Sequence, residues 1–97
     1  MSNQVSTGNL YGTVVDEQNN ALPGVTMILK GQGAPKVQVT NVQGHFQFLN
    51  LAPATYSLTA ELEGFSSYEQ SLINIAIGRN TTVEIVMQPS EEENRPS

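Results

Sequence analysis

The sequence predicts an all-β domain, folded as a seven-stranded antiparallel Greek-key β-sandwich. Short runs in which apolar and polar residues alternate recur along the chain, and Gly, Pro and Asn separate them. No window of about ten residues shows helical spacing of apolar side chains without an interrupting Gly or Pro. The length of 97 residues suits one domain with a modest core and leaves no room for a second.

The first expected strand covers residues 9–16. Alternation divides its side chains between two faces: Leu10, Gly12 and Val14 on one, Tyr11, Thr13 and Val15 on the other. A glycine inside a strand, here Gly12, indicates a bulge or the close approach of another stretch of backbone. The second strand, residues 25–30, follows a Pro23-Gly24 turn and leaves Ile28 on its outer face.

The third and fourth strands, residues 36–40 and 45–49, flank the segment Asn41-Val42-Gln43-Gly44. An Asn side chain can cap its own turn, and a Gly readily adopts positive φ. This pattern is typical of a type I turn followed by a left-handed residue, so we expect the two strands to form a β-hairpin.

The fifth strand, from Tyr56 to Glu63, has the clearest period of two, with Glu61 and Glu63 on its polar face. Strands over residues 68–76 and 80–88 complete the domain around a loop at 77–79. The alternation predicts the following core: Leu10, Val14, Val25, Met27, Leu29, Phe46, Phe48, Leu51, Tyr56, Leu58, Leu62, Val83 and Ile85.

The two ends differ in composition from the predicted domain at residues 9–88. Residues 1–8 are expected to form a flexible arm, and residues 89–97, with three consecutive Glu and two Pro, a disordered acidic tail. The first ten residues lack the basic and apolar regions of a signal peptide, and no apolar run approaches the roughly 20 residues that cross a bilayer. We therefore expect no membrane insertion.

Charge and cysteine content exclude several function classes. The net charge of −5 argues against binding to nucleic acid or anionic membranes, because both need clustered basic residues. The chain has no cysteine, so it forms neither a disulfide nor a thiolate metal site. Its stability must come from packing.

Five segments, taken in order, have a recognisable combination of residues and spacing: 12–16 (GTVVD), 21–26 (ALPGVT), 39–48 (VTNVQGHFQF), 51–60 (LAPATYSLTA) and 64–65 (GF). Together they resemble the carboxypeptidase regulatory-like domain over residues 9–88. The chain departs from the family pattern at Asn41, where Asp is usual, and at Ala54, where Gly is usual. The second change suggests that position 54 does not need positive φ.

The resemblance implies a prealbumin-like (transthyretin-like) β-sandwich that acts as an accessory domain. Such domains follow the catalytic domain in some metallocarboxypeptidases, precede outer-membrane receptor barrels and recur in adhesin-like surface proteins. An extracellular, periplasmic or cell-surface location is thus implied. The start of the chain also suits a cytoplasmic protein, including one that assembles into a phage-tail-like particle.

The sequence predicts no catalytic, cofactor or metal site. His45 is the single histidine, whereas a zinc site needs three or four converging ligands. Glu61 and Glu63 share one strand face, which favours a solvated surface over a catalytic pair. The turn that holds Asp16, Glu17 and Asn19 leaves weak calcium binding open, although calcium prefers six or more oxygen ligands.

We therefore expect a non-catalytic module that gives structural support or binds a protein within a larger protein or assembly, with weak self-association possible. Docking would use apolar outer-face residues or strand addition to a sheet edge. The candidate interaction residues are Tyr11, Val15, Ile28 and Tyr68. The alternative is an adhesin-like surface domain that binds a glycan or a peptide; the chain has no Trp, so Tyr11 and Tyr68 would supply the exposed aromatic rings.

Overall fold

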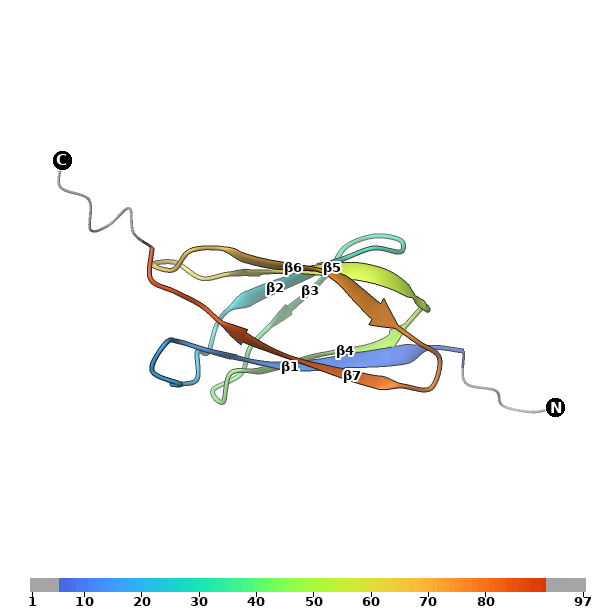
Figure 1. The fold of residues 1–97 in the computed structure, drawn as a ribbon, viewed down its shortest axis with the longest axis horizontal. Helices are drawn as coiled ribbons and strands as arrows, with labels where there is room; N and C mark the ends of the chain where they lie inside the picture. Colours follow the sequence, from blue (N-terminus) through green and yellow to red (C-terminus); the bar gives the residue numbers. More distant parts are fainter. Residues whose placement is uncertain (1–5, 91–97) are drawn as a thin grey trace.

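The computed structural model describes residues 6–90, which form two β-sheets packed face to face (Figure 1). The seven strands lie close to their predicted positions: β1 (Gly8–Val15), β2 (Thr26–Lys30), β3 (Lys36–Val39), β4 (His45–Leu51), β5 (Ala54–Glu61), β6 (Tyr68–Ile75) and β7 (Asn80–Val86). Within residues 6–90 there is no helix able to cross a membrane. The all-β sandwich predicted from alternation is confirmed.

One sheet has three strands in the order β4-β1-β7, and the other has four in the order β3-β2-β5-β6. All neighbouring strands run antiparallel except β1 and β7, which are parallel over seven residue pairs. This pair departs from the fully antiparallel arrangement expected from the sequence. A parallel pair needs a crossover connection, and here the chain crosses to the second sheet and back before β7 lies beside β1.

The turn at residues 41–44 has the predicted chemistry. The Asn41 side-chain oxygen accepts hydrogen bonds from the backbone N–H groups of Gln43 (2.9 Å) and His45 (3.0 Å), and Gly44 has a φ of 76°. The predicted hairpin is nevertheless wrong, because β3 and β4 belong to different sheets. Local turn chemistry fixes the reversal of the chain, but it does not decide with which neighbour each strand pairs.

The core lies between the two sheets and agrees closely with the prediction. Eleven of its predicted residues are buried: Leu10, Val14, Val25, Met27, Leu29, Phe46, Phe48, Leu51, Tyr56, Leu58 and Ile85. The other two, Leu62 and Val83, are partly buried against them. Alternation also places Ala60 and Met87 on the core faces of their strands, and both are buried, whereas Val15, Ile73 and Ile75 are buried residues that were not predicted.

The omission of Ile73 and Ile75 has a local cause. The pairing of β5 with β6 shifts register between Tyr56 and Leu58, so β6 contains a bulge there. Two consecutive β6 residues, Ser71 and Leu72, are both exposed, and alternation resumes beyond them with the two isoleucines inward. A bulge on an edge strand also discourages edge-to-edge pairing with another molecule.

Leu72 occupies the strained position of this bulge. Its φ is 60°, a left-handed conformation that costs a residue with a Cβ about 1–2 kcal/mol, and its side chain is 84% exposed. Leu72→Gly is therefore expected to stabilise the domain by about 0.5–1 kcal/mol, measured by urea unfolding. Leu49→Gly is the matched control, because Leu49 is an exposed strand residue without positive φ and should lose stability. A loss at both positions would contradict this account of strain.

The predicted arm and tail fall partly on residues outside the described range. Within that range, Gly8 already belongs to β1, and Pro89 forms a bridge with Phe65. The expectations for residues 1–5 and 91–97 lie outside the described residues.

Candidate functional site

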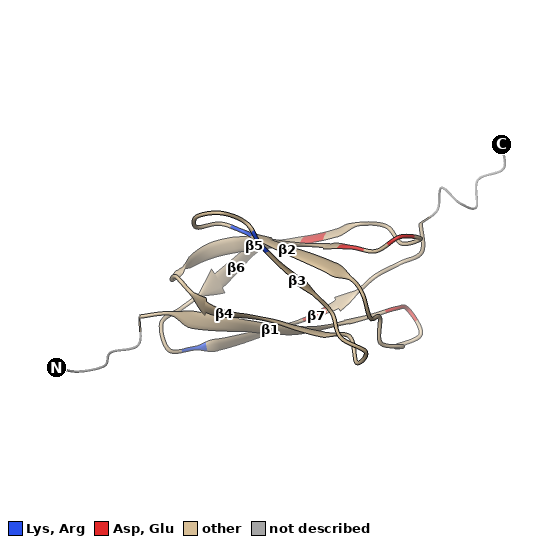
Figure 2. Cartoon of the chain, turned by 180° about the vertical axis from the view of Figure 1, so that it is seen from behind, with Lys and Arg blue, Asp and Glu red and all other residues tan. Residues whose placement is uncertain are grey.

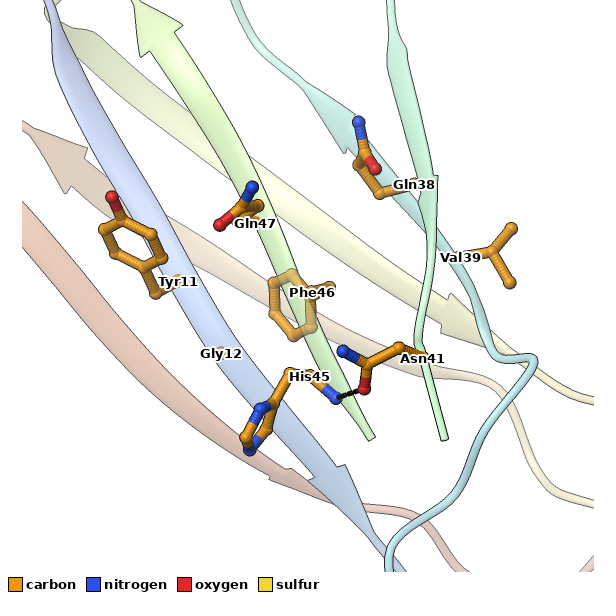
Figure 3. A pocket seen from close by; sticks show the side chains of 8 residues that line it. All are labelled: Tyr11, Gly12, Gln38, Val39, Asn41, His45, Phe46 and Gln47. Atoms are coloured by element: carbon orange, nitrogen blue, oxygen red, sulfur yellow. Dashed lines mark hydrogen bonds between the residues drawn. The ribbon is translucent and has the colours of Figure 1, made fainter. Parts of the chain in front are cut away.

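A recess in the described residues lies where β3 and β4 diverge from the 41–44 turn (Figure 3). We call it the β3–β4 groove; it has a volume of about 410 Å³. Its lining comes from β1, from β3 with the following turn, and from β4: Tyr11, Gly12, Gln38, Val39, Asn41, His45, Phe46 and Gln47. Each sheet thus contributes one edge strand to the groove.

Gly12 and Phe46 form the apolar base of the groove. The two residues are register partners in the β1–β4 pair, and a Cβ at position 12 would collide with the Phe46 ring. The group that approaches Gly12 closely is thus an aromatic side chain and not the backbone expected from the sequence. The ring also packs edge-on against Phe48, with 6.0 Å between ring centroids. The missing side chain of Gly12 therefore leaves room for the far edge of the Phe46 ring next to β1.

Thr40 fastens the start of the groove to β2. It is a buried polar residue, 4% exposed, and its hydroxyl donates a hydrogen bond to the Leu22 carbonyl oxygen at 2.7 Å. The same oxygen accepts the Val25 N–H at 2.9 Å. Sequence reasoning missed this role, although Thr40-Asn41 was recognised as a family landmark. The buried hydroxyl is fully paired, so it stabilises the fold and is not free for chemistry.

Both edge strands direct unpaired backbone groups into the open side of the sandwich. In β4, the His45 carbonyl accepts the Asn41 N–H, and the Gly44 carbonyl accepts the Val14 N–H at 2.8 Å. Peptide groups alternate in direction along a strand. The backbone groups of Gln47 therefore point away from β1, as those of His45 do, and remain available to a further strand.

The same alternation applies to β3. The Thr40 N–H donates to the Val25 carbonyl at 3.0 Å, so the backbone of residue 40 is directed towards β2. The peptide groups of Val37 and Val39 then point away from β2, towards the free edge. Both of these valine side chains are 56% exposed on the outer face of the four-stranded sheet. An exposed strand edge with apolar side chains is a template for pairing with another chain.

The groove is almost free of charge. Neither β3 nor β4 contains an acidic residue, and the groove is polar mainly through the amides of Gln38, Asn41 and Gln47. Figure 2 shows that acidic residues gather mostly towards the end at which β7 leaves the domain. Electrostatic attraction therefore contributes little to ligand binding at the groove. Selectivity would come from the shape of the groove and from backbone hydrogen bonds.

The structure separates the four residues predicted to mediate docking. Tyr11 lines the groove and is partly exposed. Ile28 lies on the outer face of the other sheet, paired in register with Val37. Val15 is only 7% exposed, so it offers little surface to a partner, although it lies outside the core cluster. Tyr68 pairs with the buried Ala60 and packs against the core. These residues do not form one surface.

Val39 and Gln47, which line the groove from its two edge strands, were not singled out from the sequence. One signal was available: Lys36-Val37-Gln38-Val39 is a short alternating run that contributes nothing to the predicted core. Such a run is typical of an edge strand. β3 and β4 lie close to each other because the same turn connects them, but they enter different sheets. No local sequence pattern shows that the two strands separate in this way.

Asp16 is a titratable residue engaged in several hydrogen bonds. Residues 6–90 contain no group of three His, Cys, Asp or Glu side chains placed to hold a metal ion. The Asp16 carboxylate accepts the N–H groups of Asn20 (2.9 Å) and Gln18 (2.8 Å), and its bond to Asn20 is the main cause that lowers its pKa below the ordinary value of 3.8. This carboxylate is therefore engaged in capping its own turn.

Comparison with known proteins gives both a family and relatives. The carboxypeptidase regulatory-like domain family matches residues 9–88. The TonB-dependent transporter Oar of Myxococcus xanthus is 28% identical over 88 residues, which is 86% of this chain and 8% of the transporter. The chain thus spans a small part of that relative.

Two solved structures show how widely the fold is used. GBS52, the minor pilin of Streptococcus agalactiae, has a TM-score of 0.72 and 22% identity over 97% of this chain and 49% of the pilin. The 3-chlorocatechol 1,2-dioxygenase of Rhodococcus opacus has a TM-score of 0.67 and 12% identity over 93% of this chain and 63% of the enzyme. Since a pilin and an enzyme share it, the sandwich by itself does not define an activity.

Proposed function

The chain belongs to the carboxypeptidase regulatory-like domain family, and we propose that it is a non-catalytic accessory module that docks an extended protein segment in the β3–β4 groove. The observation that carries the proposal is the pair of free strand edges that diverge over the Phe46 ring. Peptide-binding domains commonly extend an exposed sheet edge by one strand. The likeness to a pilin and to part of a transporter is consistent with a role inside a larger assembly.

Strand addition at β4 explains the contacts that the groove offers. A segment laid antiparallel or parallel to β4 would pair with the outward N–H and C=O groups of Gln47, giving affinity that is independent of sequence. Every second side chain of the segment would then lie on the same inward face as Phe46, and those positions favour apolar residues. The occupant is thus an extended, uncharged segment with alternating apolar residues.

The test uses a library of displayed nonapeptides selected on the wild-type domain, followed by affinity measurement with labelled peptides. Gln47→Pro removes one outward N–H on an edge strand and should weaken selected peptides about tenfold or more while the domain stays folded. Val39→Lys should act similarly by placing a charge at the rim. Val42→Lys is the matched control, because Val42 is 82% exposed in the turn and should change nothing. Peptides insensitive to both groove variants, or no selected peptide, would contradict the proposal.

A glycan is the second candidate occupant, favoured by the ring of Tyr11 beside the amides of Gln38, Asn41 and Gln47. Sugars are bound by stacking on aromatic rings and by hydrogen bonds to amides. A glycan array would show binding that is lost in Tyr11→Ala, kept in Tyr11→Phe and unaffected by Gln47→Pro. The opposite sensitivity, to Gln47→Pro alone, would favour the peptide.

A further inference from the structure

The first and last strands of the domain lie side by side and run in the same direction. β1 and β7 pair in register from Asn9–Asn80 to Val15–Val86. The chain therefore enters the sandwich at one end and leaves it at the other, as Figure 1 shows. A domain in line with its neighbours would be pulled through these two strands in opposite directions.

Hydrogen bonds extend this parallel ladder beyond both strands. At the entry end the Gly78 N–H donates to the Thr7 carbonyl at 2.9 Å, and the Asn9 N–H donates to the Arg79 carbonyl at 3.0 Å. The Asn9 and Asn80 side chains add a bond of 3.0 Å. At the exit end the Met87 N–H donates to the Val15 carbonyl at 2.9 Å. The ladder is thus closed at each end, where fraying would otherwise begin.

We propose that the β1–β7 pair is a mechanical clamp that lets this domain transmit tension along its parent chain. Tension between the two ends pulls β1 and β7 past each other, so all bonds of the ladder carry the load together. Tension applied across the ladder would instead break the bonds one after another. The force at which a domain ruptures depends on its unfolding rate. When many hydrogen bonds are loaded together they must break together, so the free-energy barrier to rupture is higher than when they break one by one.

The interior positions strengthen the clamp. Leu10, Gly12 and Val14 of β1 are buried, and their backbone groups bond to β4 on the other side. β1 is consequently held between two strands, and sliding it would break both pairings at once. The proposal does not depend on binding in the β3–β4 groove, because the load passes through the pairings that β1 makes within its own sheet.

A short segment after β7 should yield before the clamp. The Ser66 N–H donates to the Gln88 carbonyl at 2.8 Å, and the Ser90 N–H donates to the Gly64 carbonyl at 3.0 Å. Pulling from Ser90 breaks these bonds first, which releases about three residues, or roughly 10 Å of chain. The main rupture should follow at higher force.

The test is single-molecule force spectroscopy on the full chain with two attachment geometries. The chain has no cysteine, so introduced pairs are unique handles. Ser6→Cys with Ser90→Cys pulls β1 and β7 past each other. Gln18→Cys with Ser90→Cys opens the same ladder from the paired Val15–Val86 end. We expect the first geometry to rupture at roughly twofold higher force or more. Equal forces in the two geometries would overturn the proposal.

Two threonines provide matched variants within the ladder. Because the Met87 N–H is directed to β1, alternation directs the N–H of Thr81 to β1 and that of Thr82 to the free edge of β7. Thr81→Pro should lower the end-to-end rupture force markedly, and Thr82→Pro should leave it nearly unchanged. Thr81→Val keeps the backbone N–H but changes the side chain, so it distinguishes loss of the hydrogen bond to β1 from loss of the threonine side chain. Equal rupture forces in the two proline variants would also contradict the clamp, and the comparison of pulling directions remains decisive if Thr81→Pro fails to fold.

Discussion

Gly44→Ala is expected to destabilise the domain by about 2–4 kcal/mol. Gly44 has a φ of 76°, where a Cβ costs about 1–2 kcal/mol. The added atom would also lie 2.6 Å from the Val14 carbonyl oxygen and 3.2 Å from the Leu22 nitrogen. Both are backbone atoms, so relief requires movement of β1 or of the turn before β2. Urea unfolding monitored by circular dichroism measures the loss.

Gly33→Ala is the control for the conformational part of this cost. Gly33 has a similar φ of 74°, but no atom lies within 4 Å of its ideal Cβ position. The control should lose only about 1 kcal/mol. Equal losses at both positions would show that the close approach to Val14 contributes nothing.

Thr40→Val is the second large effect, with an expected loss of about 2–3 kcal/mol. Valine has nearly the shape of threonine but leaves the Val25 N–H and the Leu22 carbonyl oxygen without their hydroxyl partner. Buried groups that lose a partner keep the full cost of desolvation. Thr40→Ser retains the hydroxyl and removes one methyl group, so it should cost only about 1 kcal/mol. If Thr40→Ser lowers the free energy of unfolding as much as Thr40→Val does, the stabilisation does not come from the hydroxyl hydrogen bonds.

Thr40 and Gly44 lie on either side of the turn from which β3 and β4 diverge, so these variants also bear on the groove. Thr40 holds the end of β3 to the start of β2, and Gly44 brings the start of β4 against β1. Together they set the angle between the two edge strands. Variants of Thr40 or Gly44 that remain folded should therefore bind the peptides selected on the wild-type domain less well, even though neither residue lines the groove.

The strands and most of the core were predictable because they depend on local alternation. In β5, Tyr56 and Leu58 are buried while Glu61 is exposed, since a sheet with one wet face separates side chains with a period of two. The Asn41 cap and the positive φ of Gly44 were also predictable, because turn chemistry acts over four or five residues. Alternation failed at β6, where the bulge at Leu72 shifts the pattern by one residue.

The residue pattern alone is enough to predict the all-β class, the seven strands, the family and the turn at residues 41–44. Which strands are neighbours becomes clear only in the folded domain, where β3 and β4 separate into different sheets and β7 lies parallel to β1. Strand pairing depends on contacts between residues far apart in the chain, such as Gly12 with Phe46 and Val15 with Val86. The groove and the β1–β7 ladder are both products of that pairing, and the only local signal for either is the edge-strand pattern at residues 36–39.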